Sequence, residues 1–398
     1  MIERPSYLEF LKKLKDKKII KVVTGIRRCG KSTLFDLYKS FLLETGISEK
    51  QIISMNFENP NDNIFDNWRD LYNYIEKKLL KGKMNYIFLD EVQIIEGFEK
   101  AVDGLFIKDN VDLYITGSNS YMLSGELATY LSGRYMAVHM LPLSFKEYMQ
   151  ANHFDNEGLA YQAYISTGGF PYLMNIAGEA DLITNYLDGI YNTILMKDVV
   201  ARGKIKDVMI LESLTKFLTD NIGSLVSTKK ISDTLNSNSR NNSVNTIESY
   251  LSCLTDSYIF YKVTRYDIRG KENLKTGDKY YICDLGLRNY LLGGVRDTGR
   301  ILENIIFLEL KRRGYNIYVG KNGQNEVDFV VKNNDGLKYI QVALSVRDEK
   351  TLERELSSLT NIKDNYPKFL ITLDYDTVDH NGIKQISALD FLLGRVDI

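Results

Sequence analysis

Residues 25–33 read Gly25-Ile26-Arg27-Arg28-Cys29-Gly30-Lys31-Ser32-Thr33, which satisfies the phosphate-loop pattern G-x-x-x-x-G-K-[ST]. The apolar, β-branched run 19–24 precedes the loop, and the segment after it carries apolar residues at helical spacing. A strand, a glycine-containing loop and a helix in that order point backbone N–H groups and the positive end of the helix at phosphate oxygens. We therefore expect the loop to bind a nucleoside triphosphate, with Lys31 on the β- and γ-phosphates and Ser32 on Mg²⁺. Thr33 is the poorer candidate for the metal.

An ordinary glycine turn is the alternative, and residues 85–91 argue against it. This apolar run ends in Asp90 and Glu91, as a buried parallel strand does when it opens into an active site. Asp90 is expected to hold the Mg²⁺ shell. Glu91 is expected to orient or deprotonate the attacking water. Taken alone, two acids after a strand are also typical of a solvated strand end.

A third strand-like run, residues 111–116, leads into Gly117-Ser118-Asn119. The carboxyl ends of parallel strands meet at one edge of a sheet, so these small and polar side chains are expected beside the loop. Ser118 or Asn119 is expected to sense the γ-phosphate or to position the water. Matching chemistry at all these strand ends favours a nucleotide site over solvated termini.

The composition is that of a globular enzyme. The chain has 398 residues, enough for two or three domains, and its 51 Lys and Arg residues balance 52 Asp and Glu residues. No apolar stretch approaches the roughly 18 residues that a membrane span needs, and the N-terminus lacks a signal-peptide pattern. The three cysteines and three histidines show no ligand spacing, so we expect no zinc site, no disulfide framework and a reducing cytoplasm. Cys29, beside Lys31 and a helix N-terminus, is expected to favour the thiolate.

Four regions are expected along the chain. Residues 1–142 alternate strand-like and helix-like runs, which predicts a P-loop domain whose parallel sheet is covered by helices on both faces. Residues 143–218 have a mainly helical pattern and are expected to form a lid. Residues 219–298 give helix, turn, helix and hairpin, the order of a winged helix. Residues 299–398 return to alternating strands and helices, which predicts a separate α/β domain.

Together these motifs resemble a known family, the AAA-type ATPases of archaeal and bacterial genomes that end in a restriction-endonuclease-like domain. The resemblance is carried by the phosphate loop and by Phe88-Leu89-Asp90-Glu91-Val92-Gln93, Ile115-Thr116-Gly117-Ser118-Asn119-Ser120, Leu131-Ser132-Gly133-Arg134-Tyr135, Pro142-Leu143-Ser144-Phe145 and Gly168-Gly169-Phe170-Pro171. Residues 281–288 and Glu303-Asn304 extend it into the C-terminal half. The resemblance implies ATP rather than GTP, and hydrolysis rather than transfer to a small acceptor. The sequence agrees, because it contains no Asn-Lys-x-Asp guanine signature.

By the same resemblance, Arg134 looks like the Gly-Arg arginine of the family. It is a candidate finger for the γ-phosphate, acting in cis or from a neighbouring subunit. A finger from a neighbour would imply a homo-oligomer. The alternative is a surface arginine that caps a helix. The resemblance also places Arg4 and Tyr7 in an N-terminal segment near the base.

The C-terminal region departs from a working nuclease of this type. The resemblance matches Glu303 to the leading helix acid and Asp328 to the metal-binding acid. Such a site uses carboxylates to hold Mg²⁺ and a lysine to help activate water. Here Gln341 stands where a carboxylate is usual, and Ala343 stands in place of the lysine. We expect no phosphodiester cleavage, and a fold that is kept as a binding or packing platform.

The sequence thus predicts a Mg²⁺-dependent ATPase whose nucleotide state moves the lid and the C-terminal modules, and so controls an association with DNA or a protein partner. DNA would bind through the winged helix, whose candidate wing, residues 262–279, interleaves basic residues with tyrosines. Winged helices also dock proteins. The alternative function is a low-turnover, ATP-gated switch whose output is complex formation. No membrane partner is expected.

Overall fold

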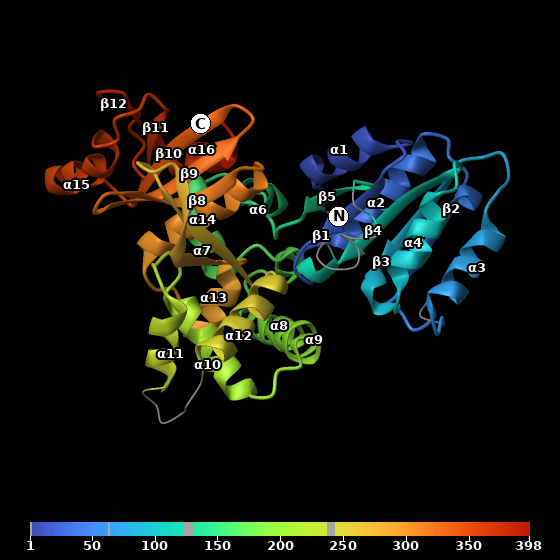
Figure 1. The fold of residues 1–398 in the computed structure, drawn as a ribbon. Helices are drawn as coiled ribbons and strands as arrows, with labels where there is room; N and C mark the ends of the chain where they lie inside the picture. Colours follow the sequence, from blue (N-terminus) through green and yellow to red (C-terminus); the bar gives the residue numbers. More distant parts are fainter. Residues whose placement is uncertain (1, 63, 123–130, 132, 237–242) are drawn as a thin grey trace. The chain divides into compact units, whose positions relative to one another are not determined.

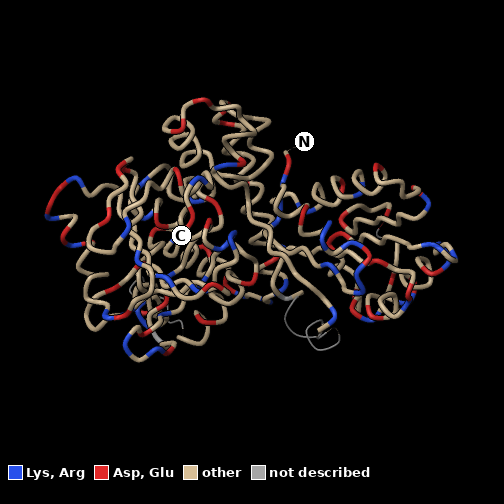
Figure 2. The backbone as a smooth tube through the Cα atoms, turned by 90° about the horizontal axis from the view of Figure 1, so that it is seen from above, with Lys and Arg blue, Asp and Glu red and all other residues tan. Residues whose placement is uncertain are grey.

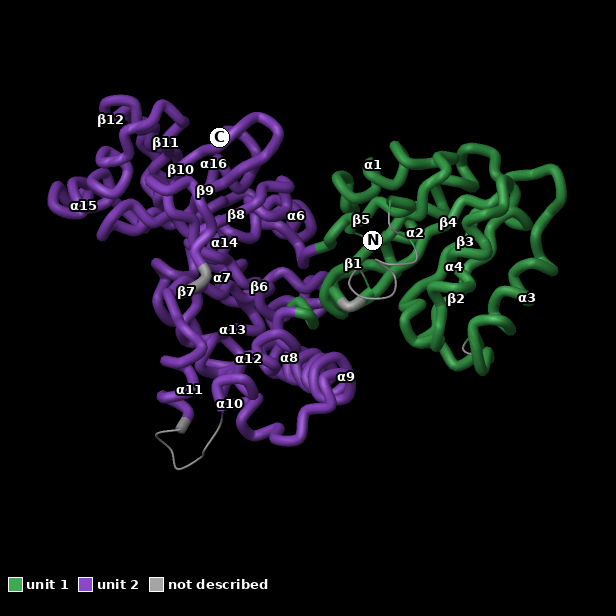
Figure 3. Tube along the Cα trace, in the orientation of Figure 1, with its two compact units in different colours: residues 1–140, 256–258 green, residues 141–255, 259–398 purple. Residues whose placement is uncertain are grey.

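The chain folds into two compact units. The computed structural model describes residues 2–62, 64–122, 131, 133–236 and 243–398. Unit 1 comprises residues 1–140 and 256–258, and unit 2 comprises residues 141–255 and 259–398 (Figure 3). Among the described residues, no helix is both long and apolar enough to cross a bilayer.

Unit 1 is a five-stranded parallel sheet with the strand order β2-β3-β4-β1-β5 (Figure 1). Its strands are β1 (Ile20–Thr24), β2 (Ile52–Asn56), β3 (Asn85–Asp90), β4 (Val111–Gly117) and β5 (Tyr135–His139). Its helices are α1 (Pro5–Leu14), α2 (Lys31–Glu44), α3 (Trp68–Lys78) and α4 (Phe98–Phe106). The parallel α/β sheet expected of the first 142 residues is confirmed.

Helices cover both faces of this sheet because alternate strand residues point to opposite sides. On one face, strand residues such as Val22 and Leu89 join a core cluster with residues of α3 and α4. On the other face, the Phe88 ring stacks on Tyr114 at 4.7 Å between centroids and meets the α2 residue Phe35 at 5.2 Å. Burial on both faces explains why these strands read as nearly continuous apolar runs.

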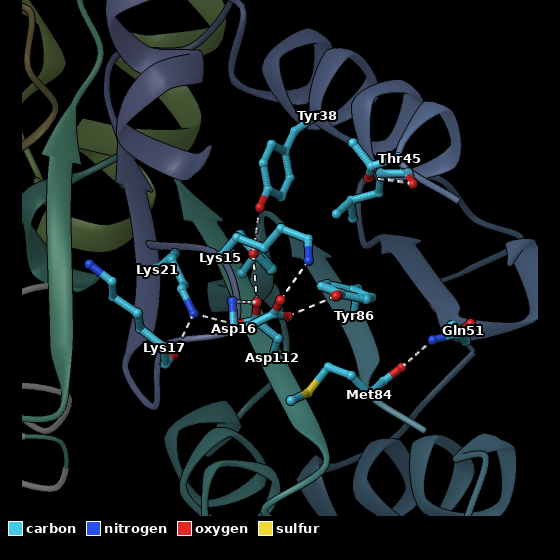
Figure 4. A network of polar contacts seen from close by, with 12 residues as sticks. Lys15, Asp16, Lys17, Lys21, Tyr38, Thr45, Gln51, Met84, Tyr86 and Asp112 are labelled. Atoms are coloured by element: carbon cyan, nitrogen blue, oxygen red, sulfur yellow. Dashed lines mark hydrogen bonds and ion pairs between the residues drawn. The ribbon is translucent and has the colours of Figure 1, made fainter. Parts of the chain in front are cut away.

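A buried polar network interrupts the second face (Figure 4). Lys21 on β1 and Asp112 on β4 are 0% and 2% exposed, and their side chains form an ion pair. Asp112 also accepts hydrogen bonds from the Tyr114 hydroxyl at 2.8 Å and from the Asp16 N–H at 2.9 Å. The Tyr38 hydroxyl of α2 lies 2.9 Å from that of Tyr114. The network joins two central strands to α2 and to the turn after α1.

Unit 2 contains an eight-stranded mixed sheet with the order β12-β13-β11-β10-β9-β8-β6-β7. Its strands are β6 (Phe260–Asp267), β7 (Glu272–Ile282), β8 (Asn316–Asn322), β9 (Asn325–Asn333), β10 (Gly336–Ala343), β11 (Lys368–Thr372), β12 (Asp379–His380) and β13 (Ile383–Ser387). Its helices are α6 (Phe145–Ala151), α7 (Glu157–Thr167), α8 (Ala180–Thr193), α9 (Ala201–Gly203), α10 (Val208–Asp220), α11 (Thr228–Asn236), α12 (Val244–Asp256), α13 (Leu285–Leu292), α14 (Thr298–Arg312), α15 (Glu349–Thr360) and α16 (Ala388–Leu393).

The hairpin β6–β7 follows α11 and α12, in the order expected of residues 219–298. A single bridge between Val226 and Asp278 also ties the segment before α11 to β7. The hairpin does not stand apart, because β6 pairs in parallel with β8 and so continues the C-terminal sheet. The expected boundaries at residues 142, 218 and 298 stay predictions.

The motif Gly168-Gly169-Phe170-Pro171 contacts a segment far away in the sequence. Gly168 has φ +84°, and the Gly169 N–H donates to the Asp284 carboxylate at 2.6 Å. A Cβ atom on Gly286 would lie 2.1 Å from the Thr167 carbonyl oxygen, so only glycine fits there. Burial raises the pKa of Asp284 to about 6, against the hydrogen bonds it accepts. The close contacts of Gly169 and Gly286 therefore hold residues 167–169 against residues 284–286.

The Lys21–Asp112 pair should stabilise unit 1 only while both partners are present. In Asp112→Ala the ammonium of Lys21 stays buried without its counter-ion, which typically costs about 3–5 kcal/mol of unfolding free energy. Replacing both, as in Lys21→Met with Asp112→Leu, should recover most of this loss. Urea unfolding of the three proteins measures it. Equal losses in the single and double variants would contradict the account.

Candidate nucleotide-binding site

The phosphate loop lies between β1 and α2, as its sequence predicts. Gly25 has φ +151° and Gly30 has φ +104°, a region that favours glycine. A Cβ atom on Gly25 would lie 2.2 Å from the Met140 carbonyl oxygen. Gly30 is the N-cap of α2 and provides no side chain, so no side-chain cap occupies the first N–H groups of this helix. The loop thus offers backbone donors to an anion.

Lys31 lies inside this loop. Its side chain is 4% exposed, and its ammonium donates to the carbonyl oxygens of Gly25 at 2.9 Å and Ile26 at 3.3 Å. It also pairs with the Glu91 carboxylate at 3.2 Å. Burial by itself would lower the pKa of Lys31, but the charge of Glu91 outweighs it and the pKa is raised. Lys31 is therefore a fixed positive charge at the centre of the loop.

The two expected Mg²⁺ ligands lie together. The Ser32 hydroxyl shares a hydrogen bond with the Asp90 carboxylate. Burial raises the pKa of Asp90, aided by the charge of Glu91 and opposed by its hydrogen bonds from Ser32 and Thr116. A hydroxyl and a carboxylate are ligands that Mg²⁺ prefers, so these side chains fit the ion. No cluster of three or more Asp, Glu, His or Cys placed for a metal occurs in the described ranges, so the nucleotide and water would have to supply the other ligands.

Thr116, near the end of β4, was not among the residues expected from the sequence. Its hydroxyl donates to the Asp90 carboxylate and accepts the Glu91 N–H at 2.9 Å. One threonine therefore fixes both acids of the neighbouring strand β3. Its position next to Gly117 in the third strand-like run is the only signal that could have singled it out.

Glu91 adopts a left-handed conformation with φ +54° and is 5% exposed. Gln93 holds its carboxylate, because the amide Nε2 donates to Glu91 Oε2 at 2.5 Å and lies 3.4 Å from the Ser118 hydroxyl. Burial would raise the pKa of Glu91, but the charges of Lys31 and Arg27 outweigh this and lower it. Glu91 is thus an ionised carboxylate, as a base must be. In the sequence, the only signal for Gln93 is its place in the motif Phe88-Leu89-Asp90-Glu91-Val92-Gln93.

Asn119 and Ser118 are 2% and 0% exposed at the end of β4. The Asn119 Oδ1 atom is buried, and within the described part of the chain it has no hydrogen-bond partner. Such an atom is costly to bury without a partner, so the Asn119 side chain is a candidate to bind a ligand or a water molecule here. Asn119 thus keeps an acceptor available at the strand end where the sequence predicts a sensor.

The remaining loop residues make separate contacts. Arg27 is 9% exposed and forms an ion pair with Glu58, beyond the end of β2, while Arg28 is exposed. Arg4, from the segment before α1, donates to the Cys29 carbonyl oxygen at 3.0 Å. The N-terminal segment expected near the base therefore contacts the backbone of the loop. Glu58 carried no signal in the sequence.

The expectation that Cys29 favours the thiolate is wrong. Cys29 is 0% exposed, and burial raises the pKa of its thiol despite the nearby charges of Lys31 and Arg4. Desolvation of the charged form outweighs two cations because the sulfur is removed from water altogether. The sequence showed the cations but not the burial.

Arg134 is not brought to this site. Its carbonyl oxygen accepts the Ile20 N–H at 2.9 Å, so it lies beside the first residue of β1, at the edge of the sheet opposite the phosphate loop. Its guanidinium is 46% exposed and pairs with Asp103. The structure of the single chain therefore gives no support to a finger in cis. A finger in trans stays a prediction.

The expected C-terminal residues form a second polar cluster in unit 2. The Lys279 ammonium, 2% exposed on β7, lies 2.8 Å from Glu303, 2.8 Å from Glu326 and 3.5 Å from Asp328. Burial and the charge of Glu303 raise the pKa of Asp328 to about 7. The loss of the lysine at Ala343 is visible in the sequence, but the position of Lys279 beside these carboxylates is not, because a separate strand supplies it.

Gln341 is committed to other contacts. Its carbonyl oxygen accepts the Asp328 N–H at 3.3 Å, and its amide donates to Glu355 of α15 at 2.9 Å. The neutral residue at this position therefore links β9 to α15 and does not join the carboxylates around Lys279.

Two family comparisons cover most of the chain. Residues 17–149 match the family described as an AAA domain, and residues 159–298 match a domain of unknown function, DUF8612. Among solved structures, the Walker-type ATPase PABY2304 of Pyrococcus abyssi matches with 15% identity and a TM-score of 0.48, over 73% of this chain and 96% of that one.

Two relatives match almost from end to end. An uncharacterized protein of Haemophilus influenzae is 41% identical over 401 residues, which is 99% of each chain. An uncharacterized protein of Methanocaldococcus jannaschii is 30% identical over 390 residues, covering 93% of this chain and 85% of the relative. This chain therefore belongs to the protein family that these two relatives represent, and its unit 1 is an AAA-type P-loop domain.

Proposed function

We propose that this chain is a Mg²⁺-dependent ATPase whose binding and hydrolysis steps both take place in unit 1. The observation that supports this most is the meeting of Lys31, the Ser32–Asp90 pair and ionised Glu91 at one sheet edge. Each has a different role in phosphoryl transfer: Lys31 would bind phosphate, Ser32 and Asp90 would bind the metal, and Glu91 would activate water. A glycine turn with solvated strand ends would not bury all of them together.

Lys31 is the residue that must change partners. The triphosphate would compete with Glu91 and the loop carbonyls for the Lys31 ammonium. The negative charge of the triphosphate favours this exchange. Glu91 is then released to accept a proton from the attacking water, while Gln93 keeps the carboxylate oriented. Mg²⁺ held by Ser32 and Asp90 would neutralise part of the phosphate charge. Asn119 and Ser118 would contact the water or the γ-phosphate.

A low-turnover, ATP-gated switch is the second candidate function. The Lys31–Glu91 pair favours it, because the base is engaged by a cation and an amide in this state and must be freed before each turnover. The ratio of hydrolysis rate to nucleotide release rate separates the two functions. An enzyme turns over many times for each binding event, whereas a switch retains its nucleotide.

We also propose that residues 219–298 form a winged helix that binds DNA or a protein. The order α11, α12 and hairpin β6–β7, with the bridge at Val226 before α11, supports it. The charge distribution does not by itself select DNA, since Lys and Arg are interspersed with Asp and Glu along the backbone (Figure 2) and the net charge is −1. Arg134 acting in trans, within a homo-oligomer, is part of the same proposal.

The last part of the proposal is that residues 299–398 form a nuclease-like domain without cleavage activity. The absent lysine at Ala343 and the neutral Gln341 support it. Lys279 places a positive charge beside the carboxylates. Its ammonium lies between Glu303 and Glu326, where a nuclease of this type would bind its metal ion. The carboxylates are thereby used in ion pairs.

Lys31→Ala and Glu91→Gln should separate binding from hydrolysis. Lys31 contacts ground-state phosphates, so its loss should weaken ATP affinity by about 10- to 100-fold, the value of one or two charge-assisted contacts. Glu91 acts mainly in the transition state, so Glu91→Gln should keep ATP affinity and lower turnover by about 10²- to 10⁴-fold. Nucleotide titration and phosphate release measure both.

The matched control is Lys39→Ala, which removes a lysine of α2 that contacts Asp36 and Ser54 and lies outside the phosphate loop. It should leave both quantities unchanged. Undiminished hydrolysis by Glu91→Gln would remove Glu91 from the role of base.

The purified chain should not cleave plasmid, linear or single-stranded DNA in Mg²⁺ or Mn²⁺, because Ala343 replaces the usual lysine and the Lys279 ammonium is engaged by Glu303, Glu326 and Asp328. Gel assays at increasing protein concentration check this. Cleavage that disappears in both Asp328→Ala and Lys279→Met would contradict the prediction, and would show that Lys279 replaces the lysine missing at Ala343.

A further inference from the structure

Residues 256–258 form a short crossing between the units. Asp256 is the last residue of α12, and the chain continues from Tyr258 into β6; both neighbouring segments, 141–255 and 259–398, belong to unit 2. Asp256, Ser257 and Tyr258 nevertheless belong to unit 1, as the short green piece in Figure 3 shows. Ser257 and Tyr258 are 1% and 9% exposed. The crossing is therefore part of the nucleotide-binding unit and is not a surface linker.

Asp256 is attached to the predicted sensor. Its carboxylate accepts a hydrogen bond from the Ser120 hydroxyl at 2.5 Å. Ser120 directly follows Asn119, whose buried Oδ1 atom has no hydrogen-bond partner in the part of unit 1 that is described. A shift of Asn119 on contacting a phosphate or water would therefore move Ser120, the next residue, and through its hydrogen bond would displace Asp256.

Tyr258 is attached to the strand that carries the phosphate loop. Its hydroxyl shares a hydrogen bond with Thr24, the residue before Gly25. Its ring lies 4.4 Å from the His139 ring, and His139 Nδ1 lies 3.2 Å from the Thr24 hydroxyl oxygen. Burial raises the pKa of Tyr258 to about 12, so the hydroxyl stays neutral.

The backbone of the crossing is also held under strain. Tyr258 has φ +62°, a left-handed conformation that is unfavourable for a bulky residue and that persists only where surrounding contacts impose it. A segment of three residues spans at most about 10 Å, so it has little slack with which to absorb a displacement. A movement at either attachment is therefore expected to reach α12 or β6.

We propose that Asp256 and Tyr258 are positioning residues of the nucleotide site, and that this crossing passes the nucleotide state of unit 1 to α12 and β6. The inference rests on the proposed function, and it adds the path by which the nucleotide state would reach α12 and β6. The sensor strand acts on the crossing through Ser120 and Asp256. The phosphate-loop strand acts on it through Thr24 and Tyr258. These are the last helix and the first hairpin strand of the proposed winged helix.

The test uses the full chain with a slowly hydrolysed ATP analogue and measures hydrogen exchange of residues 244–267. The wild type should change its protection in α12 and β6 when the analogue binds. Tyr258→Phe keeps the ring on His139 but loses the hydroxyl, and Ser120→Ala removes the donor to Asp256. Both should bind the analogue within about twofold of the wild type and lose most of the protection change.

Turnover adds a readout that simple packing would not move. Each lost hydrogen bond should lower kcat about threefold to tenfold while leaving KM nearly unchanged. Asp256→Ala should show the same loss, and Asp256→Asn should restore much of it because the amide oxygen still accepts from Ser120. The control is Tyr250→Phe, a buried tyrosine of α12 whose hydroxyl accepts the Asp207 N–H at 3.3 Å within unit 2. It should behave as the wild type.

The outcomes are distinct. A wild type that binds the analogue without any change in α12 or β6 would overturn this inference alone, as would an unaltered response in Tyr258→Phe and Ser120→Ala. A wild type that binds no nucleotide would overturn the proposed function, and the inference with it.

Discussion

The nucleotide site depends on the parallel register of three neighbouring strands. Because β3, β4 and β1 are adjacent and run in the same direction, their carboxyl ends deliver Asp90, Asn119 and the phosphate loop to one edge. Thr116 holds the ends of β3 and β4 together at this point, since its hydroxyl contacts the Asp90 carboxylate and the Glu91 N–H. A slip of one residue would turn these side chains to the other face and leave Lys31 without Glu91.

The parts that the sequence predicted are those set by local patterns. The phosphate loop needs glycine at two left-handed positions and a helix directly after it, and both demands are visible within nine residues. The apolar runs of β1, β3 and β4 identify buried parallel strands, because burial on both faces removes the usual alternation. Acids or amides at their ends then predict one edge. The closeness of Ser32 and Asp90 follows from this, whereas the contact of Lys31 with Glu91 was not among the expectations.

The parts that the sequence could not give depend on burial and on contacts over long distances along the chain. Cys29 looked reactive because its charged neighbours are adjacent in sequence, whereas its loss of water is a property of the fold. Arg134 follows β4 closely in the sequence, but it precedes β5, which begins at the end of the sheet away from the phosphate loop. Lys279 and Tyr258 reach their partners from strands or turns that no spacing rule connects. Local periodicity contains no information on such pairs.

Calorimetric titration of the full chain with ATP, with Mg²⁺ present and with Mg²⁺ chelated, tests the central claim most directly. Lys31 and the loop N–H groups bind phosphates by themselves, whereas Ser32 and Asp90 contribute through the metal. We predict one ATP per chain, an affinity that falls at least about tenfold on chelation, and weaker binding of GTP. No binding of ATP, or an affinity that is indifferent to Mg²⁺, would contradict the assignment of this sheet edge as an ATP·Mg²⁺ site.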